Sequence, residues 1–209
     1  MRRSLLSILM ILLAAMSATA QEKTARVTAY AEFQPATVYQ TNGGKLALPK
    51  ANIFLKSSSL LYQSGKDVKE ANLKTVERVD FKDRSYQRID SVLAYVVDSI
   101  GSNVLYCAKR IDVTAYQQLL RNSKTITNLD MSWMLNYATI DVTDNDDYLF
   151  PLVPTYYYRL NGKYVLVHER NLRRVLNKDQ RRIMDTLISL SDFSWTNEKC
   201  LLDLLRRIN

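Results

Sequence analysis

Residues 155–168 read TYYYRLNGKYVLVH, and this stretch predicts a β-hairpin. Asn161-Gly162 is the residue pair that a two-residue type I′ turn prefers, because both positions need a positive φ. Such a turn places Arg159 opposite Tyr164 and Tyr158 opposite Val165. One face then carries Tyr156, Tyr158, Val165 and Val167, and the other carries Tyr157, Arg159, Tyr164, Leu166 and His168. The alternation leaves open which face is buried.

After the hairpin the hydrophobic period changes from 2 to 3.6, which predicts helices from Asn171 onward. Asn177 and Gln180 have capping-box spacing for one helix, and Thr196 is the predicted cap of the last one. Trp195 and Cys200 have the spacing of a hydrophobic staple around that cap. The apolar stripes are Leu172, Val175 and Leu176, then Ile183, Met184, Leu187, Ile188 and Leu190, and finally Leu201, Leu204, Leu205 and Ile208.

The N-terminal half predicts antiparallel strands joined by short turns. Alternation predicts a strand over 27–33, and Asn42-Gly43 predicts a second type I′ hairpin. Further strands are expected over 53–63, as one bent strand, and over 93–99 and 104–111 as a hairpin. A short helix is expected over 114–122 and a strand over 131–142.

Strands followed by helices define an α+β class, here an antiparallel β-rich domain with short hairpins and C-terminal amphipathic helices. Residues 21–209 are expected to form one domain, since 189 residues lie within the usual size range. The polar stretch 123–130 breaks the pattern and is the best candidate for a subdomain boundary.

The first twenty residues have the pattern of a secretory signal peptide. Arg2 and Arg3 precede an apolar run, and Ala18-Thr19-Ala20 supplies the small residues of a cleavage site. Gln21, and not Cys, follows, so a diacylated lipoprotein is not expected. We expect an exported protein, periplasmic or at the cell surface or secreted, with no transmembrane segment after cleavage.

Several of these segments together resemble small exported proteins of Bacteroidetes-type bacteria that have no assigned function. The resemblance rests on the Ala20-Gln21 junction, Val79-Asp80-Phe81 with Tyr86 and Ile89, the Tyr156–Lys163 hairpin, the helices after it and the ending Leu205–Asn209. It implies a β-rich envelope or secreted protein with a helical end. It implies no catalytic residue and no ligand.

Positive charge gathers in residues 163–182, where seven Lys and Arg face two acidic residues, a net charge of +5. The mature chain carries +6 in total, so most of its excess lies here. The candidate residues for binding an anionic partner are Arg170, Arg173, Arg174, Lys178, Arg181 and Arg182. An acidic protein, a glycan or a lipid phosphate fits an exported basic surface better than nucleic acid does. The alternative is an ordinary solvated helix face.

Cys107 and Cys200 are the chain's two cysteines, and an oxidising compartment permits a disulfide between them. Two buried thiols are the equally weighted alternative. The lone histidine, His168, cannot form a His-based metal site and is expected to be structural or exposed. Acidic residues at 141, 144, 146 and 147 fit no EF-hand spacing and are expected to be turn residues.

These patterns predict no metal and no cofactor, and they favour a non-catalytic exported protein that engages an anionic envelope component or an acidic protein. The alternative is a carboxylate-based periplasmic hydrolase acting on glycan or peptide. Its two acidic side chains would meet only in space and leave no short motif. A purely structural component of an assembly is a third hypothesis.

Overall fold

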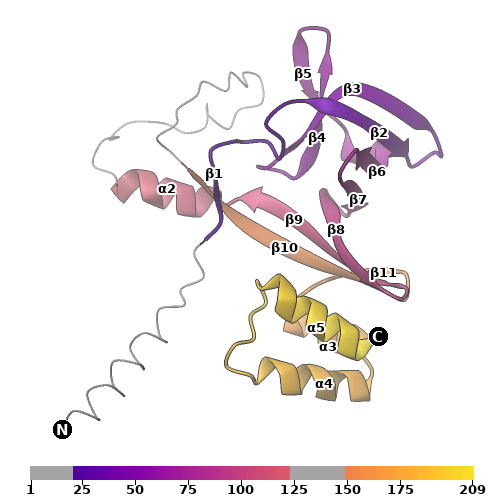
Figure 1. Ribbon diagram of the computed structural model, residues 1–209, viewed down its shortest axis with the longest axis vertical. Helices are drawn as coiled ribbons and strands as arrows, with labels where there is room; N and C mark the ends of the chain where they lie inside the picture. The colour runs from indigo at the N-terminus through magenta and orange to yellow at the C-terminus, as the bar shows by residue number, and fades with distance from the viewer. Residues whose placement is uncertain (1–20, 123–148) are drawn as a thin grey trace.

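The fold is a curled antiparallel sheet with helices packed at its C-terminal end (Figure 1). The structure is a computed structural model and describes residues 21–122 and 149–209. The strands are β1 (Lys23–Thr24), β2 (Gln34–Gln40), β3 (Lys45–Phe54), β4 (Ser59–Ser64), β5 (Asp67–Glu70), β6 (Val76–Phe81), β7 (Ser85–Ile89), β8 (Val92–Ile100), β9 (Asn103–Ile111), β10 (Phe150–Leu160) and β11 (Lys163–Leu166). The helices are η1 (Leu73–Thr75), α2 (Val113–Asn122), α3 (Glu169–Val175), α4 (Lys178–Ile188) and α5 (Glu198–Ile208). The α+β class is confirmed.

The strands form one sheet in the order β1-β10-β9-β8-β7-β6-β2-β3-β4-β5, with β11 also pairing with β10. The connection between β3 and β4 returns to the middle of this sheet. Leu93 N donates to Ser58 O at 2.7 Å, and Ile111 N donates to Leu55 O at 2.8 Å. These bonds join segments far apart in the strand order, so the sheet curls into a half-barrel.

The C-terminal hairpin has the register that the sequence predicts. Tyr158 pairs with Val165 and Arg159 with Tyr164, and Asn161 and Gly162 have φ values of 49° and 78°. The structure also decides which face is buried: Tyr158 is 0% exposed, whereas Tyr164 is 39% exposed.

Helices α3, α4 and α5 cover the buried face of the hairpin. Their core residues include Leu172, Met184 and Leu204, which pack together with Tyr158 and Leu105 of the sheet. The Tyr158 hydroxyl donates to the backbone oxygen of Leu201 at 2.5 Å. The predicted capping box at Asn177 and Gln180 is present. This end of the molecule is therefore a helix layer packed on a sheet.

Three local predictions about the N-terminal half are wrong. The segment 27–33 is not a strand: Thr28 makes a single bridge to Phe54, and beyond it the side chain of Asn52 bonds to both Tyr30 N and Tyr30 O. The Asn42-Gly43 turn is not type I′: among residues 41–44 only Gly43 has a positive φ, and the turn closes with Gly43 N donating to Gln40 O. The predicted bent strand over 53–63 is two strands separated by a turn.

The predicted cap of α5 is shifted by one residue along the chain. Asn197, and not Thr196, caps α5, since the Asn197 side chain accepts from Lys199 N. The first turn of α2 is bonded by Asp112, whose carboxylate accepts from Ala115 N at 2.9 Å. Asn197 and Asp112 each have a side-chain oxygen in reach of a free backbone N–H of their helix.

Three predictions fall outside the described residues: the signal peptide over 1–20, the boundary near 123–130 and the strand over 131–142. Within residues 21–122 and 149–209, no helix has the length and apolar character needed to cross a membrane.

Candidate functional site

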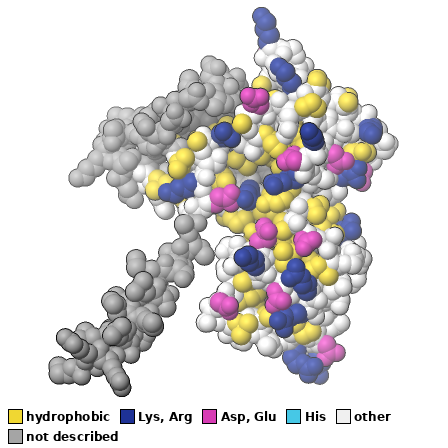
Figure 2. Space-filling view, in the orientation of Figure 1, with side chains coloured by type: hydrophobic (Ala, Val, Ile, Leu, Met, Phe, Trp, Pro, Cys, Tyr) yellow, Lys and Arg dark blue, Asp and Glu magenta, His cyan; other side chains and the backbone are white. Residues whose placement is uncertain are grey.

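The six predicted binding cations lie on α3 and α4, at the helical end of the molecule. Figure 2 shows Lys and Arg side chains on this end interspersed with Asp and Glu. The helix periodicity correctly places these cations on the outer surface: five of the six are exposed, and Arg173 is partly buried. The neighbouring acidic residues decide how many of the charges are available to a partner.

Three of the six cations bond within the protein. Arg173 lies between two carboxylates, with Nε 2.9 Å from Glu169 and a terminal nitrogen 2.5 Å from Asp185. These bonds raise the pKa of Arg173 and tie α3 to α4. Arg181 Nε donates to Leu176 O at 2.8 Å, at the junction of the same two helices. Arg182 pairs with Asp179 at 3.5 Å on the exposed surface.

The other three cations, Arg170, Arg174 and Lys178, form no ion pair with any described residue. All three side chains are exposed. Arg170 and Arg174 are four residues apart on α3, so they share one helix face. We call these three residues the basic triplet. Carboxylates therefore neutralise two of the six predicted cations, and a third, Arg181, is held by a backbone oxygen.

The predicted disulfide is not present, because the structure has Cys107 and Cys200 as free thiols. Cys107 is buried in β9, directly across from Tyr95 of β8. Burial raises the pKa of the Cys107 thiol to about 11. Cys200 lies in the first turns of α5, where its Sγ is 3.6 Å from the backbone oxygen of Asp192. The alternative of two buried thiols holds for Cys107 only, since Cys200 is partly exposed.

His168 is the N-cap of α3, where its Nδ1 accepts from Arg170 N at 3.3 Å. Its ring stacks on Trp195 with centroids 6.4 Å apart. This is a structural role. The acidic stretch at 141–147 lies outside the described residues, and within the described ones no group of three or more His, Cys, Asp or Glu could hold a metal ion.

A second candidate site lies on the same face of the sheet that the helices cover in part. Tyr86, Tyr95, Cys107 and Tyr156 pair in sequence across β7, β8, β9 and β10, so they form one row on this face. Cys107 and Tyr156 belong to the core beneath the helices. Tyr95 packs against that core and also lines a cavity of about 260 Å³, with Tyr86 next to it. The cavity therefore begins where the helix layer ends.

The cavity wall combines positive charge with apolar surface. The charged lining residues are Lys23 of β1, Arg84 before β7, Lys109 of β9 and Glu22. Glu22 and Lys109 neutralise each other, since both carboxylate oxygens lie 2.7 Å from Lys109 Nζ. The apolar part includes Ile53, Leu55 and Leu152. Two cations, Lys23 and Arg84, therefore remain without a carboxylate partner among the described residues.

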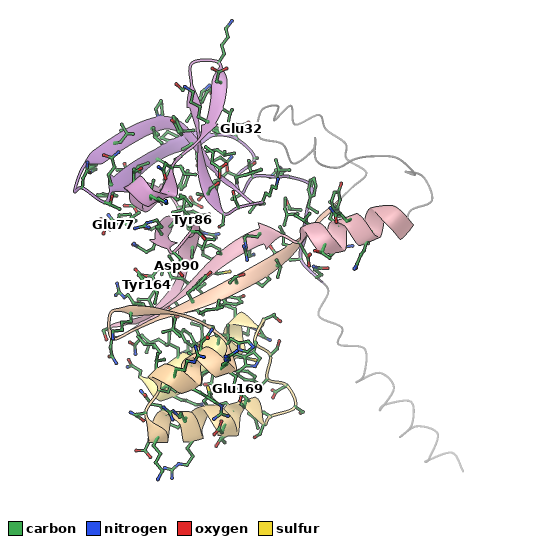
Figure 3. All side chains as sticks on the ribbon, turned by 180° about the vertical axis from the view of Figure 1, so that it is seen from behind. Glu32, Glu77, Tyr86, Asp90, Tyr164 and Glu169 are labelled. Carbon is green, nitrogen blue, oxygen red and sulfur yellow. The ribbon has the colours of Figure 1, made fainter. Side chains whose placement is uncertain are left out.

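Arg84 is held in place by aromatic side chains. Its guanidinium lies over the Tyr95 ring, 4.3 Å from the centroid, and the Tyr86 ring packs edge-on against Tyr95 with centroids 6.0 Å apart. The neighbouring Asp83 is engaged elsewhere, because it accepts from the Tyr30 hydroxyl at 3.1 Å. Figure 3 labels Tyr86, between the upper part of the sheet and β8 to β10. The pKa values of Tyr30, Tyr86 and Tyr95 are raised, mainly because the hydroxyls are buried. These hydroxyls therefore stay neutral and can form hydrogen bonds.

The sequence did not reveal this cavity. Lys82-Asp83-Arg84 reads only as a turn between two strands, which it is. The residues that line the cavity come from segments more than 120 positions apart, from Glu22 to Leu152. Strand alternation was the one available signal, since it places Tyr86 on the apolar face of its strand.

Comparisons with known protein families, with curated proteins and with solved structures found no match to this chain. Any functional conclusion must therefore come from the geometry described above.

Proposed function

We propose that this is an exported, non-catalytic binding protein that engages an anionic component of the cell envelope through the basic triplet. The observation that carries the proposal is that Arg170, Arg174 and Lys178 are exposed and form no ion pair with a described residue. Exposed cations of this kind attract phosphate- or carboxylate-rich surfaces at long range.

The helices that hold the triplet support it as a fixed surface. Arg173 joins α3 to α4 through Glu169 and Asp185, and Arg181 bonds to the end of α3. The core beneath them is closed, with Leu172 and Met184 both 0% exposed. A surface that is already ordered loses little conformational entropy on binding.

The test is capture of the protein by anionic vesicles or by an envelope extract, at low and at high salt. The triple variant Arg170→Glu, Arg174→Glu and Lys178→Glu is expected to lose capture at low salt. Wild-type capture is expected to weaken as salt rises, because exposed charges are screened. Arg173 stays unchanged in this design, since it holds the helices together.

The matched control is Lys66→Glu, Lys69→Glu and Lys74→Glu. These lysines are exposed and unpaired among the described residues, and they lie near β5 and η1, at the opposite end of the molecule (Figure 1). The two triple variants have the same net charge. Equal loss in both would show that only net charge matters and would remove the triplet's role. Capture by purified acidic proteins, and not by vesicles or glycans, would assign the surface to a protein partner.

The carboxylate hydrolase remains the alternative, and the described cavity does not favour it. A glycosidase of the usual kind needs two carboxyl groups roughly 5–10 Å apart. The cavity is lined by one, Glu22, which is bonded to Lys109. Turnover of a glycan or peptide substrate by the purified mature protein would restore this hypothesis.

A further inference from the structure

The cavity beside the helix layer has the features of a ligand site that is separate from the basic triplet. Its volume of about 260 Å³ is just below the range of roughly 300–1,000 Å³ typical of pockets for drug-sized ligands. A ligand that fills it must therefore be small. The Arg84 side chain is exposed, so the charged part of the wall can be reached from solvent.

A comparison of two arginines on the same sheet shows what is unusual about Arg84. Arg78 also lies over a tyrosine ring, with its guanidinium carbon 4.0 Å from the centroid of Tyr39. Arg78 is paired with a carboxylate, since its Nε is 3.1 Å from Asp80. Arg84 has the same aromatic support and no such carboxylate among the described residues.

A guanidinium has five N–H donors in a planar fork that matches the two oxygens of a carboxylate or phosphate. Stacking on Tyr95, whose ring is itself packed edge-on against Tyr86, restricts the orientation of this fork in the free protein. Because the wall also holds Lys23, its uncompensated charge is positive. The site is therefore preorganised for one oxyanion group.

The rest of the wall defines the other end of the ligand. Ile53, Leu55 and Leu152 line the cavity and are at most 6% exposed. Their side chains are hydrocarbon, so this part of the wall has no charged group that could bind an ionic part of the ligand. A short hydrocarbon body in contact with them would leave water, which favours binding.

We propose that this cavity binds a small amphipathic molecule with a terminal oxyanion, carboxylate or phosphate, whose oxygens bond to Arg84 and whose apolar body contacts Ile53, Leu55 and Leu152. Lys23 adds a second positive charge at the rim. The site lies away from α3 and α4, so its success or failure is independent of the basic triplet.

The experiment is calorimetric or NMR titration of the mature protein with hexanoate, hexyl phosphate and hexanol. At least one of the two anions is expected to bind, and hexanol is expected to bind at least about tenfold more weakly, because it lacks the charge. The tighter of the two anions identifies the oxyanion group. Absence of binding by both anions up to about 10 mM, or equal affinity for hexanol, would overturn the proposal.

Two variants and one control test the residues. Arg84→Gln is expected to weaken binding of the anion by about tenfold to a hundredfold, the usual effect of losing a charge-assisted bond. Arg78→Gln removes an arginine with the same tyrosine contact outside the cavity and is expected to bind as the wild type does. Equal weakening in both variants would overturn the assignment to Arg84.

Ala29→Trp gives a test that leaves Arg84 in place. Ala29 lines the cavity and is itself exposed, so a large side chain there obstructs the space at little expected cost to the core. Binding of hexanoate and hexyl phosphate is expected to fall by at least about tenfold, as for Arg84→Gln. Unchanged binding in Ala29→Trp would show that the anion binds elsewhere on the surface.

Discussion

The helical end and the cavity are built on one face of the same strands. They differ in how far solvent reaches this face and in how many of their cations are paired with carboxylates. Under α3, α4 and α5 the face is closed, and Tyr158 and Leu204 are 0% exposed. At the cavity the same face is open, and Tyr95 and Arg84 remain in reach of solvent. The helices carry many cations, and carboxylates neutralise two of the six predicted ones, whereas the cavity has few cations and leaves two unpaired. Charge density along the sequence is therefore a poor guide to where unpaired charge lies.

The strongest test of this contrast is truncation of a leucine in each region. Leu204→Ala removes a fully enclosed side chain from the helix core and is expected to destabilise the protein by about 4 kcal/mol. Leu55→Ala removes a side chain beside an existing cavity and is expected to cost about half as much. Urea unfolding of both variants measures the difference. Equal losses would mean that the cavity wall is as tightly packed as the helix core.

The buried thiol at the border of the two regions predicts a pH dependence. Burial raises the pKa of Cys107 from 9.0 to about 11, so between these values the unfolded chain loses the proton first. The resulting stability is complete below about pH 9 and is lost as the pH rises to 11, by about 2 to 3 kcal/mol. Urea unfolding from pH 8 to pH 11 is expected to show a smaller fall in Cys107→Ala than in the wild type. Parallel curves for the two proteins would contradict the burial of this thiol.

A smaller effect is expected from the buried tyrosine hydroxyl beneath the helices. Tyr158→Phe leaves the backbone oxygen of Leu201 without its bond, at a cost of about 1 to 2 kcal/mol. The control is Tyr164→Phe on the opposite face of the same hairpin, where the side chain is 39% exposed. Thermal unfolding should separate the two variants by several degrees. An unchanged melting temperature in Tyr158→Phe would place water at this position.

The smallest expected effect concerns the cap of α4. Asn177→Ala removes one half of the capping box and is expected to cost about 1 kcal/mol. Asn42→Ala, in the turn between β2 and β3, is the matched control because its side chain bonds only to Gly44 N in an exposed turn. Urea unfolding is expected to show the larger loss for Asn177→Ala. The reverse order would mean that the β2–β3 turn governs stability more than the helical end does.

Local patterns predicted the C-terminal part of the fold well, because each signal there acts over a few residues. Asn161-Gly162 fixed the turn and the register, and the leucines of α5 identified its buried face. The segment 27–33 was mispredicted because its ladder ends after one bridge, at Thr28, where the distant side chain of Asn52 bonds to the Tyr30 backbone. At Asn42-Gly43 the chain closes with Gln40 N donating to Gly44 O, which makes a longer turn than the dipeptide suggested.

The two candidate sites also differ in how far the sequence predicted them. The basic triplet was among the residues that the sequence singled out, but the sequence could not separate it from Arg173, which is held by Glu169 and Asp185. The cavity could not be predicted, since Glu22, Arg84 and Leu152 meet only after the sheet has curled.

The sequence by itself determined the α+β class, the C-terminal hairpin and the amphipathic faces of the last helices, because turn chemistry and hydrophobic period are local properties of the chain. Only the tertiary structure decided which tyrosine face is buried, which cations are neutralised and where the sheet leaves a cavity. Those outcomes depend on contacts that a local pattern does not record, such as Arg173 with Asp185 on the next helix and Leu152 N with Glu22 O, which are more than 120 positions apart.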